Sequence, residues 1–274
     1  MHRLNGKATD QISLSDRGLL YGQTLFETIP VCHQQPLLLE RHLQRLAKGC
    51  KLLSIELDLE ALQREIDEFC QAQTANKLIL RITVSMGEGG RGYANPETSH
   101  AQRILSIHPF PKHPKAHWRD GIKLGVAKIK LSSQPALAGI KHGNRLEQVI
   151  ARGQWHDDWQ EALLLDQHQF VIEGTQSNIF VRHGDSLLTP DLSDSGVAGI
   201  MREQVLELAD NIGVTSKIMS LSLADIEAAD EVFLSNSVIG LWPVREFQEQ
   251  TFSDFSISHQ LLKLLEENGA IPTL

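Results

Sequence analysis

A proline-rich stretch near the middle of the chain sets the strongest limit on how this chain can fold. Residues 108–118 read HPFPKHPKAHW, with three prolines and little hydrophobic periodicity. Proline stiffens such a segment and blocks its entry into a helix or a central strand. We therefore predict a smaller N-terminal domain over 1–110 and a larger C-terminal domain over 119–274, joined by a linker at 111–118. The 274 residues are enough for both.

Hydrophobic periodicity predicts the elements of each domain. A helix is expected over 40–53, where the apolar stripe is Leu43, Leu46, Cys50 and Leu53. Further helices are expected at 59–69, with Asp58 as its N-cap, and at 144–155, 199–212 and 257–265. Strands are expected at 25–31, 77–85, 102–108, 122–129, 162–166, 170–173, 178–181, 186–189 and 231–234. Runs of strands interrupted by a few helices indicate an α+β, or mixed α/β, architecture.

Composition and charge narrow the class of protein. Hydrophobic residues make up 41% and charged residues 22%, an ordinary globular mix, and the net charge is -8. Nucleic acid and anionic membranes are therefore poor candidate partners. The first residues lack a basic segment followed by an apolar run, and no apolar stretch reaches the ~20 residues that cross a bilayer. We expect a cytoplasmic protein.

The cysteine, histidine and serine patterns predict no metal site and no serine-hydrolase site. The three cysteines, Cys32, Cys50 and Cys70, have no metal-binding spacing, so we expect free thiols. The twelve histidines are scattered, and the best cluster lies in the proline-rich segment, so no metal site is predicted. The Gly-x-Ser-x-Gly elbow of serine hydrolases is absent.

Lys141 is a candidate nucleophilic amine. Small and apolar residues precede it in LAGIKHGNR, and a predicted helix follows. A confined apolar setting favours the neutral amine, which is the form that attacks an aldehyde. The other interpretation is a solvated lysine at the mouth of a helix.

Glu173 is a candidate buried carboxylate, because it lies between two apolar, strand-like stretches. If buried, it needs a hydrogen-bonding or cationic partner, and a pyridinium nitrogen is one such cation. The alternative is a carboxylate at a strand end, in water.

Two segments have the character of a phosphate site. The glycines in SGVAGIMR at 195–202 stand just before a predicted helix, whose free N–H groups attract anions. Ser237 offers a hydroxyl donor, and Arg45 a charge-assisted bond. Simple loop and cap geometry is the alternative for the glycines.

The glycine-rich loop over 87–92 does not fit a nucleotide-binding motif, because no Lys-Ser/Thr pair ends it and no helix pattern follows it. We interpret it as a flexible loop over a site. Its Arg91 is either a ligand for a substrate carboxylate or a solvated arginine.

The order of these signals along the chain resembles that of fold-type IV pyridoxal-phosphate enzymes. This family includes branched-chain aminotransferases, D-amino acid aminotransferases and aminodeoxychorismate lyases. The resemblance covers essentially the whole chain and is carried by SDRGLLYG at 15–22, LFETI at 25–29, HLQRL at 42–46 and EGTQSNIF at 173–180. It implies a two-domain fold with a smaller N-terminal α/β domain and a larger C-terminal domain that is barrel-like.

The resemblance implies a role for each candidate residue. Lys141 matches the Schiff-base lysine, and Glu173 matches the partner of the pyridinium nitrogen. The phosphate-binding positions match Arg45, Ala198, Gly199, Ile200 and Ser237. We add three candidate substrate contacts, Thr28, Arg91 and Asn236.

Two segments favour the lyase branch of the family. They are GGRGY at 89–93 and GIKHGNRLEQ at 139–148, which contains the Lys-His-x-Asn-Arg-Leu-Glu pattern typical of lyases. Branched-chain aminotransferases usually have a tyrosine five residues after the lysine, where this chain has Leu146. Gln23 departs from the family, since many relatives have an acidic residue or histidine there.

The resemblance therefore implies a pyridoxal-phosphate enzyme that converts 4-amino-4-deoxychorismate to 4-aminobenzoate and pyruvate in folate synthesis. It also implies a homodimer. Transamination of a D- or branched-chain amino acid is the first alternative. The second is a protein that binds pyridoxal phosphate or a small anion without catalysis, and the presence of both Lys141 and Glu173 argues against it.

Overall fold

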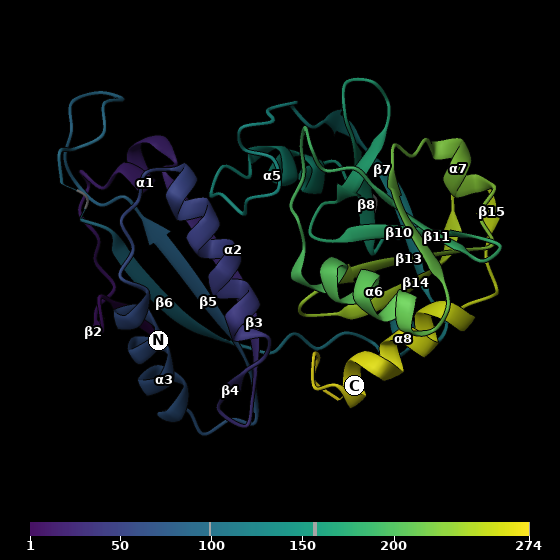
Figure 1. The fold of residues 1–274 in the computed structure, drawn as a ribbon, viewed down its shortest axis with the longest axis horizontal. Helices are drawn as coiled ribbons and strands as arrows, with labels where there is room; N and C mark the ends of the chain where they lie inside the picture. Colours follow the sequence, from purple (N-terminus) through teal and green to yellow (C-terminus); the bar gives the residue numbers. More distant parts are fainter. Residues whose placement is uncertain (99, 156–157, 274) are drawn as a thin grey trace. The chain divides into compact units, whose positions relative to one another are not determined.

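The structure is a computed structural model that describes residues 1–98, 100–155 and 158–273. It is a mixed α/β fold with two separate β-sheets (Figure 1), which confirms the predicted fold class. The chain divides into two compact units. Unit 1 comprises Met1–Pro111 and Ile140–Asn144, and unit 2 comprises Lys112–Gly139 and Arg145–Leu274.

The division differs in two places from the predicted domains. Residues 112–118, expected as a linker, pack with unit 2, and the short helix α4 (Ala116–Arg119) begins among them. Residues 140–144 pack with unit 1 because their backbone bonds to one of its strands, as described below.

Unit 1 is an antiparallel sheet of six strands in the order β2-β1-β6-β5-β3-β4, with helices packed against it (Figure 1). Its strands are β1 (His2–Leu4), β2 (Lys7–Ala8), β3 (Thr24–Cys32), β4 (Gln35–Pro36), β5 (Lys77–Ser85) and β6 (Gln102–Pro109). Its helices are α1 (Arg17–Tyr21), α2 (Leu39–Leu52) and α3 (Leu59–Gln71).

Helix α2 buries a slightly different face from the predicted stripe. Leu46 and Cys50 are buried as expected, but Leu43 is only half-buried, and His42 and Gly49 are buried instead. The glycine allows close packing on β3, since a Cβ there would lie 2.6 Å from a methyl carbon of Leu25. Helix α3 begins as predicted, with the Asp58 side chain accepting a bond of 2.9 Å from the N–H of residue 61.

Unit 2 contains a mixed sheet of nine strands, in the order β12-β11-β10-β13-β14-β7-β8-β9 with β15 paired to β14. Its strands are β7 (Ile122–Lys130), β8 (Glu161–Leu165), β9 (Val171–Gly174), β10 (Asn178–His183), β11 (Ser186–Pro190), β12 (Thr215–Met219), β13 (Glu231–Asn236), β14 (Gly240–Phe247) and β15 (Gln250–Thr251). Its longer helices are α5 (Leu146–Gly153), α6 (Ile200–Asn211) and α8 (Ser256–Glu267), and α7 (Leu223–Glu227) is short like α4.

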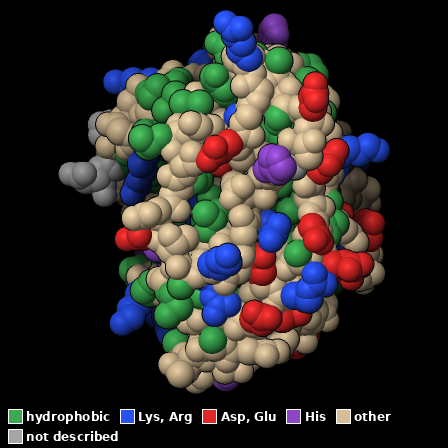
Figure 2. Space-filling view, turned by 90° about the vertical axis from the view of Figure 1, so that its left-hand side faces the viewer, with side chains coloured by type: hydrophobic (Ala, Val, Ile, Leu, Met, Phe, Trp, Pro, Cys, Tyr) green, Lys and Arg blue, Asp and Glu red, His purple; other side chains and the backbone are tan. Residues whose placement is uncertain are grey.

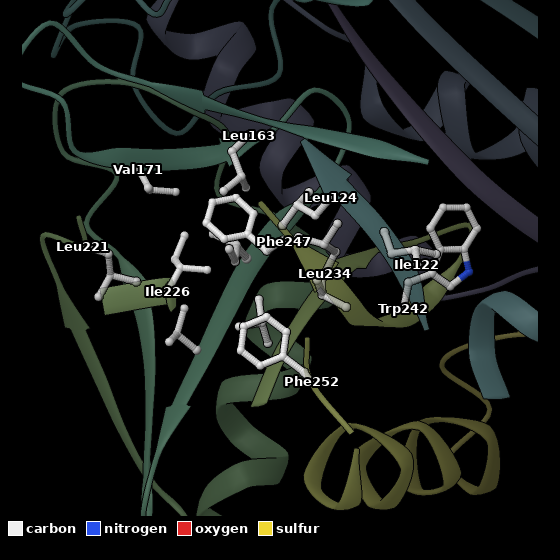
Figure 3. Close-up of a cluster of buried hydrophobic side chains, with 14 of the residues drawn as sticks. Ile122, Leu124, Leu163, Val171, Leu221, Ile226, Leu234, Trp242, Phe247 and Phe252 are labelled. Atoms are coloured by element: carbon white, nitrogen blue, oxygen red, sulfur yellow. The ribbon is translucent and has the colours of Figure 1, made fainter. Parts of the chain in front are cut away.

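The sheet of unit 2 curls around a hydrophobic core. Strand β9, at one end of the strand order, also contacts β11 near the other end, which gives the barrel-like form expected for this domain. Figure 3 shows side chains of the core converging from several strands, among them Leu124, Leu163, Val171 and Phe247. This packed core fixes the strand ends and turns that carry the candidate residues of unit 2.

Candidate active site

Lys141 lies on a short segment that is bonded to strand β3. Its carbonyl accepts the N–H of Phe26 at 3.0 Å, and the N–H of Gly143 donates to the carbonyl of Thr24 at 2.8 Å. The Lys141 Nζ lies 4.6 Å from the centre of the Phe26 ring. The side chain is half-buried, so the structure places this lysine against an aromatic ring and not on an open surface.

Arg45 lies in a buried cluster of charged groups. Its Nε and Nη2 donate to the two carboxylate oxygens of Glu27, at 2.8 and 2.5 Å. The Nδ1 of His42 also contacts this carboxylate, at 2.7 Å. Glu27 and His42 are each 1% exposed and Arg45 is 10% exposed. The cluster holds the Arg45 guanidinium in one direction.

Two members of the cluster, Glu27 and His42, have shifted pKa values. Burial alone would raise the pKa of Glu27, but the charge of Arg45 and the bonds from His42 and Arg45 outweigh it and lower that pKa to about 2. Burial lowers the pKa of His42, and the charges of Arg45 and Lys141 contribute in the same direction. The cluster therefore lies within electrostatic range of the Lys141 amine.

No role for Glu27 or His42 was expected from the sequence. One signal was available: Leu25, Glu27 and Ile29 alternate along one face of β3, so a carboxylate on an apolar face needed a partner.

Glu173 is buried at 5% exposure in β9, as predicted. Its Oε2 accepts the backbone N–H of Val197 at 2.9 Å. The side-chain amide of Asn178 donates to the carbonyl of Val197 at 3.0 Å. The peptide groups on both sides of Val197 are thus held by side chains that flank the turn between β9 and β10. Burial lowers the pKa of Arg145, and the negative charge of Glu173 acts on that pKa in the opposite direction.

The glycines before α6 are required by close contacts. Gly196 has a φ of 84°, and a Cβ there would lie 2.8 Å from Ile172. A Cβ on Gly199 would lie 2.0 Å from the amide oxygen of Asn178. Gly199 is the N-cap of α6 and makes no side-chain capping bond, and Ile200 is the first residue of the helix. The N–H of Ala198 donates to the carbonyl of Gly139 at 3.1 Å.

Asn236 and Ser237 lie at the turn between β13 and β14. The amide oxygen of Asn236 accepts the N–H groups of Val238 and Ile239 at 2.8 and 2.9 Å. Its amide nitrogen donates to the carbonyl of Gln176 at 3.1 Å. The Asn236 side chain therefore shapes this turn, and it ties the turn to the one between β9 and β10.

The glycine-rich loop is anchored by Arg17, to which the sequence analysis assigned no role. Its guanidinium donates to the carbonyls of Gly89, Gly92 and Tyr93 at 3.1, 3.0 and 3.3 Å. Arg91 is an exposed residue of this loop. Thr28 lies elsewhere in unit 1, half-buried on β3, where it pairs with residue 81 of β5.

Two kinds of feature are absent from the described residues. These residues hold no group of three or more His, Cys, Asp or Glu side chains arranged to bind a metal ion. In the same parts of the chain, no helix is long and apolar enough to cross a membrane.

Comparison with known proteins identifies the family. A model of the amino-transferase class IV family matches residues 24–247. The chain belongs to the class IV aminotransferase family. Aminodeoxychorismate lyase of Vibrio harveyi is 33% identical to this class IV protein over 246 residues, 89% of this chain and 90% of the relative. A putative branched-chain-amino-acid aminotransferase of Methanocaldococcus jannaschii is 31% identical over 279 residues, 98% and 96% of the two chains.

Among solved structures, the class IV protein is very similar to 4-amino-4-deoxychorismate lyase from Pseudomonas aeruginosa. The TM-score is 0.94 at 43% sequence identity, and the match covers 98% of this chain and 99% of the other. A pyridoxal-phosphate-bound form of a hypothetical aminotransferase from Mycobacterium tuberculosis has a TM-score of 0.85 at 20% identity and shares the fold.

Proposed function

We propose that this protein is a pyridoxal-phosphate-dependent lyase that converts 4-amino-4-deoxychorismate to 4-aminobenzoate and pyruvate. The observation that carries the proposal is the 43% identity to the Pseudomonas lyase over 98% of the chain. The KHGNRLE segment at 141–147, which is typical of lyases, supports the same branch.

The chemistry of the donor groups fits pyridoxal phosphate. The cofactor has an aldehyde, a ring nitrogen and a phosphate, and it needs an amine, a carboxylate and an anion site. Lys141 offers the amine and the buried Glu173 the carboxylate. The start of α6, where the N-cap is the glycine Gly199, offers backbone N–H groups to an anion.

We assign the roles accordingly. Lys141 holds the cofactor covalently, and Glu173 pairs with its ring nitrogen. The phosphate is held by Arg45, Ala198, Gly199, Ile200 and Ser237. The proposed substrate contacts are Thr28, Arg91 and Asn236, and Asn236 has the weakest support because its amide already shapes a turn.

Each of these residues then has its own role in the reaction. Bound pyridoxal phosphate supplies an electron sink for negative charge on the carbon that bears the substrate amine. Lys141, with its amine freed when the substrate amine takes its place, would be the base that removes the proton from that carbon. Glu173, with its Oε2 fixed by Val197, favours the protonated ring nitrogen. Loss of enolpyruvate leaves an aromatic ring, which makes the reaction strongly favourable.

A second candidate is branched-chain amino acid transamination. The observation that favours it is the 31% identity to the Methanocaldococcus protein over 98% of this chain. The lyase proposal rests on a higher identity and a comparable coverage.

We further propose that the enzyme is a cytoplasmic homodimer. The large apolar side chains of Leu14, Leu19, Leu20 and Tyr93 in unit 1 are 53–87% exposed, and a second copy would cover such groups. On the face shown in Figure 2, hydrophobic side chains gather in several groups among interspersed charges of both signs. All three cysteines are free, as in a reducing compartment. Light scattering of the purified protein would test the dimer.

Product analysis tests the function. Purified protein loaded with pyridoxal phosphate is incubated with 4-amino-4-deoxychorismate, and separately with branched-chain and D-amino acids plus a 2-oxo acid. The proposal expects 4-aminobenzoate and pyruvate in the first reaction. Exchange of amino groups in the others, without 4-aminobenzoate in the first, would establish the aminotransferase instead. No turnover with any of them would leave only a binding protein.

A further inference from the structure

Glu161 is a buried carboxylate to which neither the sequence analysis nor the proposed mechanism gives a role. It begins strand β8 and is 2% exposed. Within the described part of the chain, no lysine, arginine or histidine pairs with it. A buried ionisable group without a cationic partner is costly, so its hydrogen bonds must explain its presence.

Those hydrogen bonds converge on one turn. The backbone N–H and the hydroxyl of Thr175 donate to Oε1 at 3.1 and 2.6 Å. The N–H of Gln176 and the hydroxyl of Ser177 donate to Oε2 at 3.3 and 3.0 Å. The N–H of Ala162 completes the set at 2.9 Å. Both carboxylate oxygens therefore bind the segment that joins β9 to β10.

The turn itself is tight and built around this contact. The N–H of Gly174 donates to the carbonyl of Ser177 at 2.6 Å. A Cβ on Gly174 would lie 2.3 Å from the Ser177 hydroxyl and 3.1 Å from the carboxyl carbon of Glu161. Only glycine allows the carboxylate and the hydroxyl to approach as they do.

The two residues that flank the turn are Glu173 and Asn178, which hold the peptide groups around Val197. A continuous set of bonds thus runs from Glu161 through the turn to Glu173 and to the segment before α6. A change at Glu161 would move the carboxylate of Glu173 and its backbone partner together.

We propose that Glu161 is a positioning residue that sets the direction of the Glu173 carboxylate toward the cofactor ring nitrogen. The inference rests on the proposed role of Glu173. It also gives a physical reason for the Glu-Gly-x-x-Ser-Asn pattern, because each fixed residue in it contacts either Glu161, Val197 or the turn between them.

A purely structural role would have a different signature. If Glu161 only stabilises the turn, its loss lowers the stability of unit 2 as a whole and weakens all cofactor contacts to the same extent. If it positions Glu173, its loss selectively weakens the contact to the ring nitrogen. A cofactor analogue in which a C–H replaces the ring nitrogen, deazapyridoxal phosphate, separates the two cases.

The experiment measures the dissociation constants of pyridoxal phosphate and of the deaza analogue for the wild type, Glu161→Gln and Glu173→Gln. Glutamine keeps the shape of the side chain but loses one acceptor. We expect Glu161→Gln to weaken binding of pyridoxal phosphate about tenfold, the scale of a hydrogen bond to a charged group, and to change analogue binding less than about threefold. Glu173→Gln should show the same selectivity.

Glu231→Gln is the control for loss of another buried carboxylate of unit 2, one that pairs with Arg182. Glu231 is also fully buried in unit 2, where it accepts the N–H groups of Ile257 and Ser258 at the start of α8. Its loss should lower stability without changing the ratio of the two affinities. If Glu161→Gln does not fold, Ser177→Ala removes one donor from the same contact and takes its place.

Three kinds of outcome would contradict the proposals, and each kind overturns a different proposal. Equal weakening of both compounds by Glu161→Gln, or no weakening, overturns the positioning role alone. A wild type that binds both compounds equally well overturns the role of Glu173, and with it that of Glu161. A wild type that binds neither overturns the proposed function itself.

Discussion

Arg45 and Glu27 form a doubly hydrogen-bonded ion pair in the interior of unit 1, between helix α2 and strand β3. The proposed phosphate ligand is therefore held by a carboxylate on a neighbouring element. A change at Glu27 should therefore affect the stability of unit 1, and a change at Arg45 should affect both stability and cofactor binding.

Acid should weaken unit 1 through Glu27. Its pKa in the folded state is about 2, below the ordinary value of 4.5. The ionised group therefore stabilises the fold above pH 4.5, by about 3 kcal/mol, and this contribution is lost as the pH falls toward 2. His42 acts in the same direction, because burial lowers its pKa and protonation below pH 6.5 favours the unfolded chain.

The test compares urea unfolding of the cofactor-free wild type and Glu27→Gln at neutral and acid pH. At neutral pH the variant should be less stable by about 3–5 kcal/mol, since it removes the buried negative charge that pairs with Arg45. The difference should shrink as the pH falls below 4.5. A difference that does not change with pH would show that Glu27 is not ionised in the folded protein.

Arg45→Ala should lose both stability and cofactor affinity. The cofactor-free protein should lose a few kcal/mol of unfolding free energy, because the Glu27 carboxylate stays buried. Cofactor binding should weaken by about 1–3 kcal/mol, the scale of one charge-assisted contact. Lys48→Ala, an exposed position on the same helix, is the control for both measurements. Unchanged cofactor affinity in Arg45→Ala would restrict Arg45 to its structural pairing with Glu27.

Glu173→Gln tests the part of this carboxylate in catalysis once the cofactor is bound at saturation. Glutamine keeps an oxygen that can accept the Val197 N–H but removes the negative charge, so the ring nitrogen should lose its proton near neutral pH. We expect a folded, cofactor-bound variant whose turnover falls by at least about 10²-fold. Steady-state kinetics on the fully loaded variant measures this. Near-normal turnover would remove Glu173 from the mechanism.

Gly174→Ala should destabilise unit 2 by about 1–3 kcal/mol, because the new methyl group overlaps the Ser177 hydroxyl in a tight turn. Gly153→Ala is the matched control. It adds the same methyl group at the end of α5, where no atom of the described residues lies within 4 Å apart from the helix's own backbone and the chain neighbours. The control should be neutral or slightly stabilising. Thermal unfolding of both variants gives the comparison, and equal melting temperatures would mean that the turn adjusts freely.

Strong local patterns allowed much of the fold to be predicted from the sequence. Helix α3 combined an apolar stripe with the Asp58 cap, and β5 was a long run of β-branched and apolar residues. Strand β14 was missed because it contains Pro243, which argues against a strand that has neighbours on both sides. Strand β12 was missed because its polar, mostly exposed residues have no alternation.

The residues of the candidate site also divide into those with a local sequence pattern and those without one. Lys141 and Glu173 stand in local sequence patterns, so they could be found without a structure. Glu161 could not, because its partners in the turn lie 14 to 16 residues further along the chain and only the folding of β8 beside β9 brings them together. The role of Glu27 could not be predicted either, because its partner His42 lies on helix α2, 15 residues further along the chain.

A covalent label on Lys141 tests the cofactor assignment by itself. Borohydride reduction of the loaded protein should fix the cofactor on the peptide that contains Lys141. Peptide mass spectrometry locates the label. Attachment to any other lysine would overturn the assignment of this residue.

The most direct test of the central claim is the yield of 4-aminobenzoate and pyruvate from 4-amino-4-deoxychorismate, measured side by side for the wild type and Lys141→Ala, both supplied with pyridoxal phosphate. The wild type should form the two products in equal amounts, and the variant should lose this activity because it lacks the amine that serves as the base. A wild type that forms no 4-aminobenzoate, or a variant as active as the wild type, would contradict the claim that this chain is a lyase that works through Lys141.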